Sequence, residues 1–148
     1  MKKVDWPSAF VQRMREQLGD ESEHFFSALS QPAVISIRAN PAKWKPELED
    51  AVPWCAQGFY LDERPAFTLD PLLHGGCYYV QESSSMFLEQ VFVQLELRHK
   101  PLKILDACAA PGGKSTHIAS LMDPGSLLVS KETIASRVPA LKENLVKW

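Results

Sequence analysis

One stretch decides the fold of this chain: Ile104-Leu105-Asp106-Ala107-Cys108-Ala109-Ala110-Pro111-Gly112-Gly113-Lys114-Ser115. Its first residues have the apolar pattern of a buried strand that ends at Asp106, and the adjacent glycines Gly112 and Gly113 predict a turn. From Ser115 onward the residues can continue as a helix. A strand, a glycine turn and a helix in this order surround a bound anion with free backbone N–H groups and the positive end of the helix. The stretch therefore predicts a cradle for a ligand.

Two nucleotide-binding motifs do not fit the cradle. A phosphate-binding loop requires a glycine five positions before Gly113, where this chain has Cys108. A triphosphate enzyme that uses Lys114 and Ser115 is therefore disfavoured. A dinucleotide fingerprint requires three spaced glycines, and the chain has only an adjacent pair at this point.

An acidic residue indicates which ligand fits better. Glu132 follows the next predicted strand, about 20 residues beyond the glycines, where an acid binds ribose hydroxyls in nucleoside-binding α/β units. Folds that bind nothing at this point can also carry a glycine pair and such an acid. A ligand with a ribose, a carboxylate and no phosphate fits the residues best. The candidate is S-adenosylmethionine, with its methionine end at the glycine turn and its ribose at Glu132.

Several segments resemble a known family. The residues from Asp106 to Ser115 resemble the cofactor motif of the Nop/Nol/Sun family of RNA cytosine-5 methyltransferases, and those from Tyr78 to Met86 resemble the segment before it. Four upstream segments resemble the bacterial branch that modifies small-subunit ribosomal RNA: Pro7-Ser8-Ala9-Phe10, Ser36-Ile37-Arg38-Ala39-Asn40-Pro41, Val52-Pro53-Trp54 and Gly58-Phe59-Tyr60-Leu61. The resemblance covers nearly the whole chain. It implies a cytoplasmic, S-adenosylmethionine-dependent enzyme that forms 5-methylcytosine in ribosomal RNA.

The resemblance also implies a cofactor site. The backbone of one continuous run would hold the cofactor: Cys108, Ala109, Ala110, Pro111, Gly112, Gly113 and Lys114. Glu132 would bind the ribose. Lys131 places a cation beside this acid, where it either pairs with the carboxylate and weakens ribose binding or stays solvated.

The implied chemistry needs cysteines that this chain does not contain. A cysteine thiolate attacks C6 of a cytosine, a methyl group is transferred to C5, and a proton is then removed. The two cysteines of the family lie in Pro-Cys and Thr-Cys segments, and neither dipeptide occurs here. We therefore predict no catalytic residue and expect an inactive N-terminal part of a longer enzyme. Cys108 is expected to be a small buried residue that packs beneath the turn.

The predicted fold has two parts. Residues 1–76 are expected to form a small α+β domain that binds RNA. Residues 77–148 are expected to form the beginning of an α/β Rossmann-like methyltransferase fold. A βαβ unit of about 45 residues leaves most of its apolar strand surface bare. The strands at residues 104–105 and 127–129 are therefore expected to be exposed and to allow self-association.

Two helices of the second part have recognisable signals. Ser84 or Ser85 is predicted to cap a helix whose apolar side belongs to the core. That side consists of Met86, Phe87, Val91, Phe92 and Leu95. Pro139 falls inside the segment predicted as the second crossover helix, so this helix either begins near Val138 or contains a break.

The charge distribution gives only local support for RNA binding. The formal net charge is −2, without the overall basic character of a nucleic-acid-binding protein. Between Glu23 and Glu47, however, the chain has no acidic residue. We predict RNA contacts in this interval because cations, an amide and an aromatic ring suit phosphates and unstacked bases. The predicted residues are Arg38, Asn40, Lys43 and Lys45, next to Trp44. The alternative is a solvated strand end and loop with Trp44 packed against the core.

The remaining composition narrows the function further. Three widely spaced cysteines favour a reducing cytoplasm and disfavour a metal site. The scattered histidines are expected at the surface or at helix caps: His24, His74, His99 and His117. No apolar run is long enough for a membrane span, and the N-terminus has no signal peptide pattern. The rival to a methyltransferase is a non-enzymatic RNA-binding or ribosome-assembly protein with a vestigial cofactor fold.

Overall fold

The computed structural model describes residues 5–148. The chain divides after Ala33 into two compact units, Met1–Ala33 and Val34–Trp148. The first unit contains α1 (Ser8–Leu18) and α2 (Ser22–Leu29), joined by a 3-10 turn. Aromatic rings hold the two helices together, because the ring of Phe10 lies 6.1 Å from that of Phe26, centroid to centroid. All elements that surround the candidate site belong to the second unit.

An antiparallel sheet of three strands begins the second unit. It is formed by β1 (Ile35–Ala39), β2 (Gly58–Leu61) and β3 (Tyr78–Val80), in the order β2-β1-β3. In the central strand, Ile37 lies opposite Phe59 on one side and Val80 on the other. Every residue of β1 after the first is buried. This strand is therefore the most enclosed segment of the sheet.

The sheet joins the two sides of the domain boundary that the sequence predicts between residues 76 and 77. Strand β3 follows that boundary, yet it pairs with β1 from before it. The short helix α3 (Pro71–His74) leads into β3, and Asp70 caps this helix by accepting a hydrogen bond from the Leu72 amide at 2.9 Å. The structure's own division falls after Ala33, and the boundary at residue 76 stays a prediction.

The helix after β3 differs from the prediction at its start. A 3-10 turn (Ser83–Phe87) precedes α4 (Leu88–Gln94), and Glu82 caps the turn in place of the expected serines. The Glu82 carboxylate accepts hydrogen bonds from the amides of Ser84 at 2.9 Å and Ser85 at 3.1 Å. The predicted serine cap is therefore wrong, because the carboxylate just before the serines reaches both amides.

The apolar side of this helix is only partly core. Met86 and Phe92 are buried, as predicted. Phe87, Val91 and Leu95 are exposed by 44–59%, because no described segment covers that side. For these three residues the core prediction is wrong.

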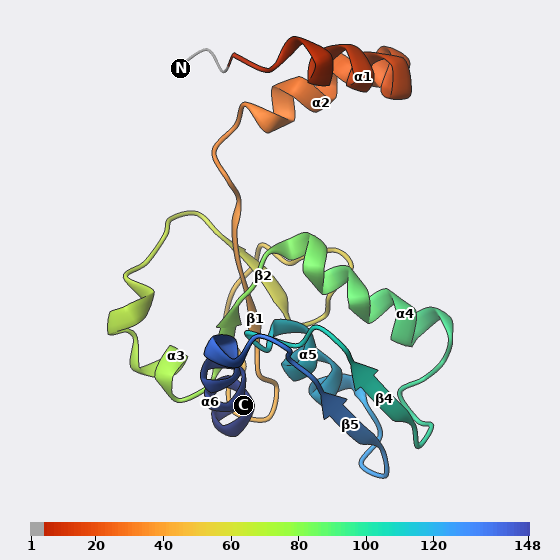
Figure 1. The fold of residues 1–148 in the computed structure, drawn as a ribbon. Helices are drawn as coiled ribbons and strands as arrows, with labels where there is room; N and C mark the ends of the chain where they lie inside the picture. The colour runs from red at the N-terminus through yellow and green to blue at the C-terminus, as the bar shows by residue number, and fades with distance from the viewer. Residues whose placement is uncertain (1–4) are drawn as a thin grey trace. The chain divides into compact units, whose positions relative to one another are not determined.

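The predicted beginning of a Rossmann-like fold follows. Strands β4 (Lys103–Asp106) and β5 (Leu127–Ser130) are parallel and adjacent, and α5 (Gly113–Leu121) connects them (Figure 1). Helix α6 is Val138–Lys147, with Pro139 in its first turn. Of the two alternatives for Pro139, the structure has the helix that begins at Val138, since proline needs no hydrogen-bond acceptor in a first turn.

The parallel strands are exposed as expected. Leu105 on β4 is 63% exposed, and on β5 the exposed fractions of Leu127 and Val129 are 57% and 49%. Self-association through these strands stays a prediction. No helix in the described part of the chain is long and apolar enough to cross a membrane.

Candidate cofactor site

Both positions of the glycine pair between β4 and α5 leave little room for a side chain. Gly112 has a φ of +113°, which residues with a side chain rarely adopt. A Cβ atom on Gly112 would also lie 3.3 Å from the Cβ of Asn144 on α6. At Gly113 a Cβ atom would lie 3.2 Å from the ring of Tyr79. The turn therefore fits closely between α6 and the segment that contains Tyr79.

Polar side chains fix the ends of the two parallel strands to the start of α5. Asp106, at the end of β4, accepts a hydrogen bond from the Ser115 hydroxyl at 2.7 Å. Ser130, the last residue of β5, donates to the same Ser115 hydroxyl at 2.9 Å. Because Ser115 is fully buried, these bonds hold the turn in one position relative to the sheet edge.

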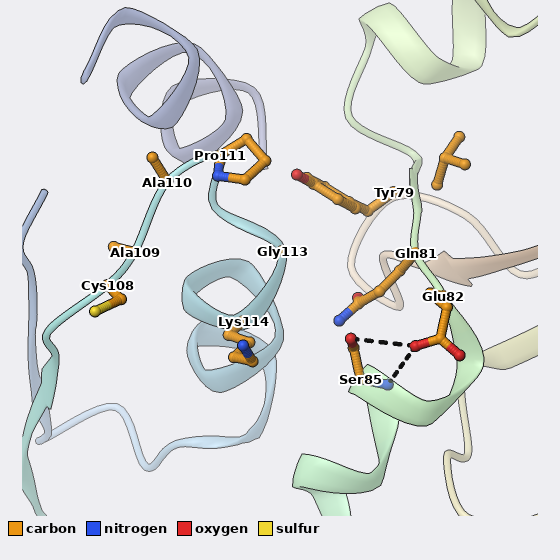
Figure 2. Close-up of a pocket in the computed structure, with 11 residues that line it drawn as sticks. Tyr79, Gln81, Glu82, Ser85, Cys108, Ala109, Ala110, Pro111, Gly113 and Lys114 are labelled. Carbon is orange, nitrogen blue, oxygen red and sulfur yellow. Dashed lines mark hydrogen bonds between the residues drawn. The ribbon is translucent and has the colours of Figure 1, made fainter. Parts of the chain in front are cut away.

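A cavity of about 260 Å³ lies beside this turn. Figure 2 shows its two walls, one made by the glycine turn and the other by the segment that leads from β3 into the 3-10 turn. The first wall contains Cys108, Ala109, Ala110, Pro111, Gly113 and Lys114, and the second Tyr79, Val80, Gln81, Glu82 and Ser85. The cavity thus joins two segments that are separate in the sequence and that both resemble family motifs.

A buried arginine connects the two walls. The Arg38 side chain, from the central strand β1, is 1% exposed. Its Nε donates to Oε1 of Gln81 at 2.8 Å, and its Nη2 donates to the hydroxyl of Thr116 at 2.7 Å and to the carbonyl of Gly113 at 3.2 Å. Burial lowers the pKa of Arg38 to about 10, so the guanidinium remains charged at neutral pH. Arg38 therefore sets the spacing between the walls.

The second wall also has a carboxylate. Hydrogen bonds from Ser84 and Ser85 lower the pKa of Glu82, so this side chain is ionised at neutral pH. The first wall has the N-terminal turn of α5 and Lys114, which favour a negative group. The cavity consequently offers positive and negative surroundings on opposite walls.

The structure brings nearly all predicted backbone residues of the cofactor motif to this cavity. Gly112 lies within the turn but does not line the cavity. Cys108 lines it and is exposed, so the prediction that Cys108 is buried is wrong. The cause is local: the amide of Cys108 donates to Asp106 at 3.3 Å, which binds the loop backbone to the end of β4 and leaves the side chain exposed.

Glu132 lies next to the same loop but does not line the cavity. The amide of Ala109 donates to the carbonyl of Lys131 at 3.0 Å, which joins the loop after β5 to the cofactor motif. The Glu132 carboxylate accepts a hydrogen bond from the Ile134 amide at 2.9 Å and lies 3.6 Å from Nη1 of Arg137. The Ile134 amide and the charge of Arg137 lower the pKa of Glu132. Arg137 therefore lies within ion-pair distance of this acid, and Lys131 is exposed, as in the alternative of a solvated lysine.

The predicted RNA-binding residues divide into buried and exposed pairs. Arg38 and Asn40 are buried and bond within the chain; Nδ2 of Asn40 donates to the carbonyls of Gly76 at 3.2 Å and Trp148 at 2.6 Å. Lys43 and Lys45 are exposed. RNA contact by these residues stays a prediction, and the solvent-accessible cations of the set are the two lysines.

The position of Trp44 agrees with the alternative to RNA contact, in which this ring packs against the core. It packs against the core, with its ring 5.7 Å from that of Tyr78. The aromatic ring beside the predicted RNA-binding cations is thus engaged in the fold.

Sequence reasoning missed a buried cluster of Cys55, Glu89 and His117. Nε2 of His117 lies 3.3 Å from Oε2 of Glu89 and 3.8 Å from Sγ of Cys55. His117 is 2% exposed, so its expected surface position is wrong. No spacing signal could have revealed the cluster, since 28 residues separate His117 from Glu89 and 62 separate it from Cys55.

The electrostatics of this cluster follow from its burial. Desolvation lowers the pKa of His117 and raises that of Cys55 to about 12, so both side chains are neutral at pH 7. Burial alone would raise the pKa of Glu89, but hydrogen bonds with His117 and Cys55 and the charge of Arg98 lower it to about 2. Arg98 forms an ion pair with Glu89. His117 and Cys55 are therefore neutral, and Arg98 compensates the negative charge of Glu89.

The class of protein follows from the fold and the cavity together. A parallel strand pair, the glycine turn and a helix beginning at the cavity define the first part of a Rossmann-like methyltransferase domain. Residues 6–83 match the family model of the N-terminal domain of 16S rRNA methyltransferase RsmF, and residues 93–147 match that of 16S rRNA methyltransferase RsmB/F. The chain belongs to the RsmB/F family of 16S rRNA methyltransferases, which confirms the resemblance seen in its motifs.

Individual relatives agree with the family model. The chain is 32% identical to ribosomal RNA small subunit methyltransferase F of Erwinia tasmaniensis, over 97% of this chain and 33% of that protein. It is 33% identical to the protein of that name from Cronobacter sakazakii, over 94% of this chain and 32% of the relative. The chain therefore spans about a third of the length of these curated relatives.

A solved structure has the same fold. The methyltransferase homolog protein from Pyrococcus horikoshii superposes with a TM-score of 0.76 and 25% sequence identity. The match covers 96% of this chain and 49% of that protein. The mixed α/β class predicted from the sequence is thus confirmed.

Proposed function

We propose that this chain is the N-terminal, cofactor-binding part of a cytoplasmic S-adenosylmethionine-dependent methyltransferase that forms 5-methylcytosine in small-subunit ribosomal RNA. The observation that carries the proposal is the cavity whose first wall is formed by residues 108–111, 113 and 114 of the cofactor motif. The named relatives are small-subunit ribosomal RNA methyltransferases, which supports the substrate class.

The residues present fit such a cofactor. The cavity volume of about 260 Å³ lies just below the usual range for small-molecule sites, which begins at about 300 Å³. Gly113 has no side chain to fill the cradle, and the N-terminal turn of α5 suits a carboxylate. When bound, S-adenosylmethionine supplies an electrophilic methyl group on a sulfonium.

In this proposal the chain's own residues bind and orient. The backbone from Cys108 to Lys114 holds the methionine end, and Glu132 accepts hydrogen bonds from the ribose hydroxyls. Arg137 orients Glu132, and its Nη2 also donates to the carbonyl of Ala110 at 2.6 Å. Arg137 thus couples the ribose acceptor to the cofactor loop.

The covalent step belongs to residues outside these 148. None of the three cysteines follows a proline or a threonine. Burial raises the pKa of Cys55 to about 12, which removes its nucleophilic form at neutral pH. We propose that the chain alone binds cofactor without transferring a methyl group, and that cysteines of the complete enzyme attack C6 of the target cytosine.

The proposal includes RNA contact by the segment of residues 38–45. Lys43 is exposed, although its Nζ also donates to the carbonyls of Gly75 at 3.0 Å and Lys147 at 2.7 Å. Lys45 is exposed as well. Cations at such a position suit the phosphates of an RNA strand.

Thermal unfolding of the purified chain tests the cofactor proposal. S-adenosylhomocysteine at 100 times its dissociation constant is expected to add about 2.7 kcal/mol to the unfolding free energy, whereas ATP with magnesium adds none. Lys114→Glu places a negative charge in the cavity wall and should abolish the stabilisation. Lys142→Glu, at an exposed position of α6, is the matched control.

Other results would point elsewhere. Stabilisation by ATP with magnesium alone would contradict the choice of cofactor. Binding of ribosomal RNA without any binding of S-adenosylhomocysteine would favour the non-enzymatic alternative.

A further inference from the structure

A buried hydrogen-bond donor in the second wall of the cavity lacks an acceptor. Gln81 is 7% exposed, and its Nε2 has no hydrogen-bond partner among the described residues. Figure 2 shows its amide extending from the second wall toward the helix that carries Lys114. A buried donor without a partner is costly, and such groups usually have a ligand or water.

The orientation of this amide follows from the chemistry of its neighbour. Nε of Arg38 can only donate a hydrogen bond, so the Gln81 atom 2.8 Å from it must be the oxygen. The nitrogen is therefore forced to the opposite side of the amide. Arg38 is itself fixed by Thr116 and Gly113. The donor position is thus preorganised by the rest of the fold.

The backbone of Gln81 is equally constrained. Its amide donates to the carbonyl of Ser36 at 3.2 Å, and its carbonyl accepts from the Ser36 hydroxyl at 2.6 Å. Ser36 belongs to the buried central strand. The backbone that carries the side chain is therefore fixed, and turning the side chain toward another acceptor would break its hydrogen bond with Arg38.

The charges around Nε2 of Gln81 indicate which group of a ligand accepts its hydrogen bond. The N-terminal turn of α5 and Lys114 on the facing wall favour a carboxylate. Glu82, next to Gln81, is ionised and suits an ammonium group. The cavity thus offers a negative group the donors of Gln81 and α5, and it offers a positive group the carboxylate of Glu82. This arrangement matches the zwitterion of an α-amino acid.

We propose that Nε2 of Gln81 donates a hydrogen bond to the α-carboxylate of the cofactor's methionine end, while Glu82 faces its ammonium group. Gln81 is then a cofactor-binding residue outside the glycine-turn motif, and Arg38 is the residue that positions it. This inference rests on the proposed function, because it names a contact to the cofactor proposed there.

The substitution Gln81→Glu tests the contact with little change to the fold. It keeps an oxygen acceptor for Arg38 and replaces only the donor that faces the cavity. Binding to the purified chain is measured by calorimetry with two ligands: S-adenosylhomocysteine and its decarboxylated analogue, which lacks only the carboxylate. Gln94→Glu, at an exposed position of α4, adds the same charge away from the cavity and is the control.

Gln81→Glu is expected to weaken S-adenosylhomocysteine binding by about tenfold or more, the effect of losing one hydrogen bond to a charged group. Binding of the decarboxylated analogue should be unchanged or tighter. Equal affinity of the variant and the parent chain for S-adenosylhomocysteine would overturn the inference and leave the proposed function intact. An equal loss for both ligands would also overturn it, because it indicates a structural effect. If the parent chain binds neither ligand, the cofactor proposal itself fails.

Discussion

Strands β1 and β4 have similar length and apolar content, yet their surroundings are opposite. In β1 all residues from Ser36 to Ala39 are buried, between two antiparallel neighbours. In β4 exposed and half-buried residues alternate, with β5 as its partner in the described part of the chain. The side chain of Ile37 is 3% exposed and that of Leu105 is 63% exposed. Burial is therefore decided by the segments that cover a strand rather than by the strand's own residues.

The difference also separates two roles within one unit. The antiparallel sheet supplies a fixed frame, and its buried Arg38 reaches the first turn of α5. The parallel pair supplies the turn that forms one wall of the cavity. Stability should therefore depend mainly on the first sheet, while the second contributes the binding surface.

We expect the greatest loss of stability from truncation of a buried side chain in the central strand. Ile37→Ala should lower the unfolding free energy by about 3 kcal/mol, because the lost side chain leaves a cavity among Phe67, Tyr78 and the neighbouring strands. The measurement is chemical denaturation followed by circular dichroism. Leu105→Ala is the matched control and should cost less than about 1 kcal/mol. Equal losses for the two variants would contradict the contrast drawn between the strands.

The connection between the sheets is tested next. Arg38→Met retains much of the side-chain volume but removes the donors to Gln81, Thr116 and Gly113. We expect a loss of about 2 kcal/mol, since buried acceptors are left without partners. The exposed Arg13 provides a control, and Arg13→Met should change the unfolding free energy by less than about 0.5 kcal/mol. A loss for Arg38→Met no larger than that of the control would show that the link between the walls has no energetic role.

A third prediction concerns pH and the cluster behind α5. His117 faces Glu89 and Cys55, with Arg98 and Arg38 nearby. Because the folded-state pKa of His117 lies below its ordinary value of 6.5, the unfolded chain binds the proton first. The stability that depends on neutral His117 is present above pH 6.5 and is lost as the pH falls, by at most about 1.4 kcal/mol per pH unit.

The carboxylate of the cluster adds to the same trend at lower pH. The pKa of Glu89 is lowered from 4.5 to about 2, so its contribution is lost as the pH falls through this interval. Unfolding free energies measured between pH 7.5 and about 5 separate the histidine from the carboxylate. His117→Gln should flatten the curve in this range, whereas His24→Gln, at an exposed position, should not. An unchanged slope in His117→Gln would contradict the assignment.

The local elements could be predicted because their signals lie within a few residues. The glycine pair predicts the turn before α5, and Pro139 predicts a helix start at Val138. The exposure of the parallel strands follows from the apolar surface that a short βαβ unit leaves bare. These predictions needed no knowledge of distant contacts.

The missed features have two causes: contacts between distant residues, and local hydrogen bonds for which neighbouring residues compete. Arg38 and Gln81 are 43 residues apart, and no local pattern distinguishes a buried guanidinium from the RNA-binding cation that was expected. The cysteine in the cofactor motif suggested a buried small residue, but the direction of its side chain depends on how Asp106 binds the loop backbone. The predicted serine cap is wrong because the Glu82 carboxylate, just before the serines, accepts both amide hydrogen bonds, although glutamate is a less common cap than serine.

A charged substitution on the exposed strand β4 should change the stability least. Leu105→Lys replaces a side chain that is 63% exposed, so the unfolding free energy at low protein concentration should change by less than about 0.5 kcal/mol. A lysine on a bare strand surface should nevertheless reduce association between copies of the chain. Sedimentation velocity over a range of concentrations measures this effect. A monomeric parent chain at all concentrations would contradict the predicted self-association. A stability loss comparable with that of Ile37→Ala would show that β4 is covered in solution, because only a buried leucine is costly to replace by a charge.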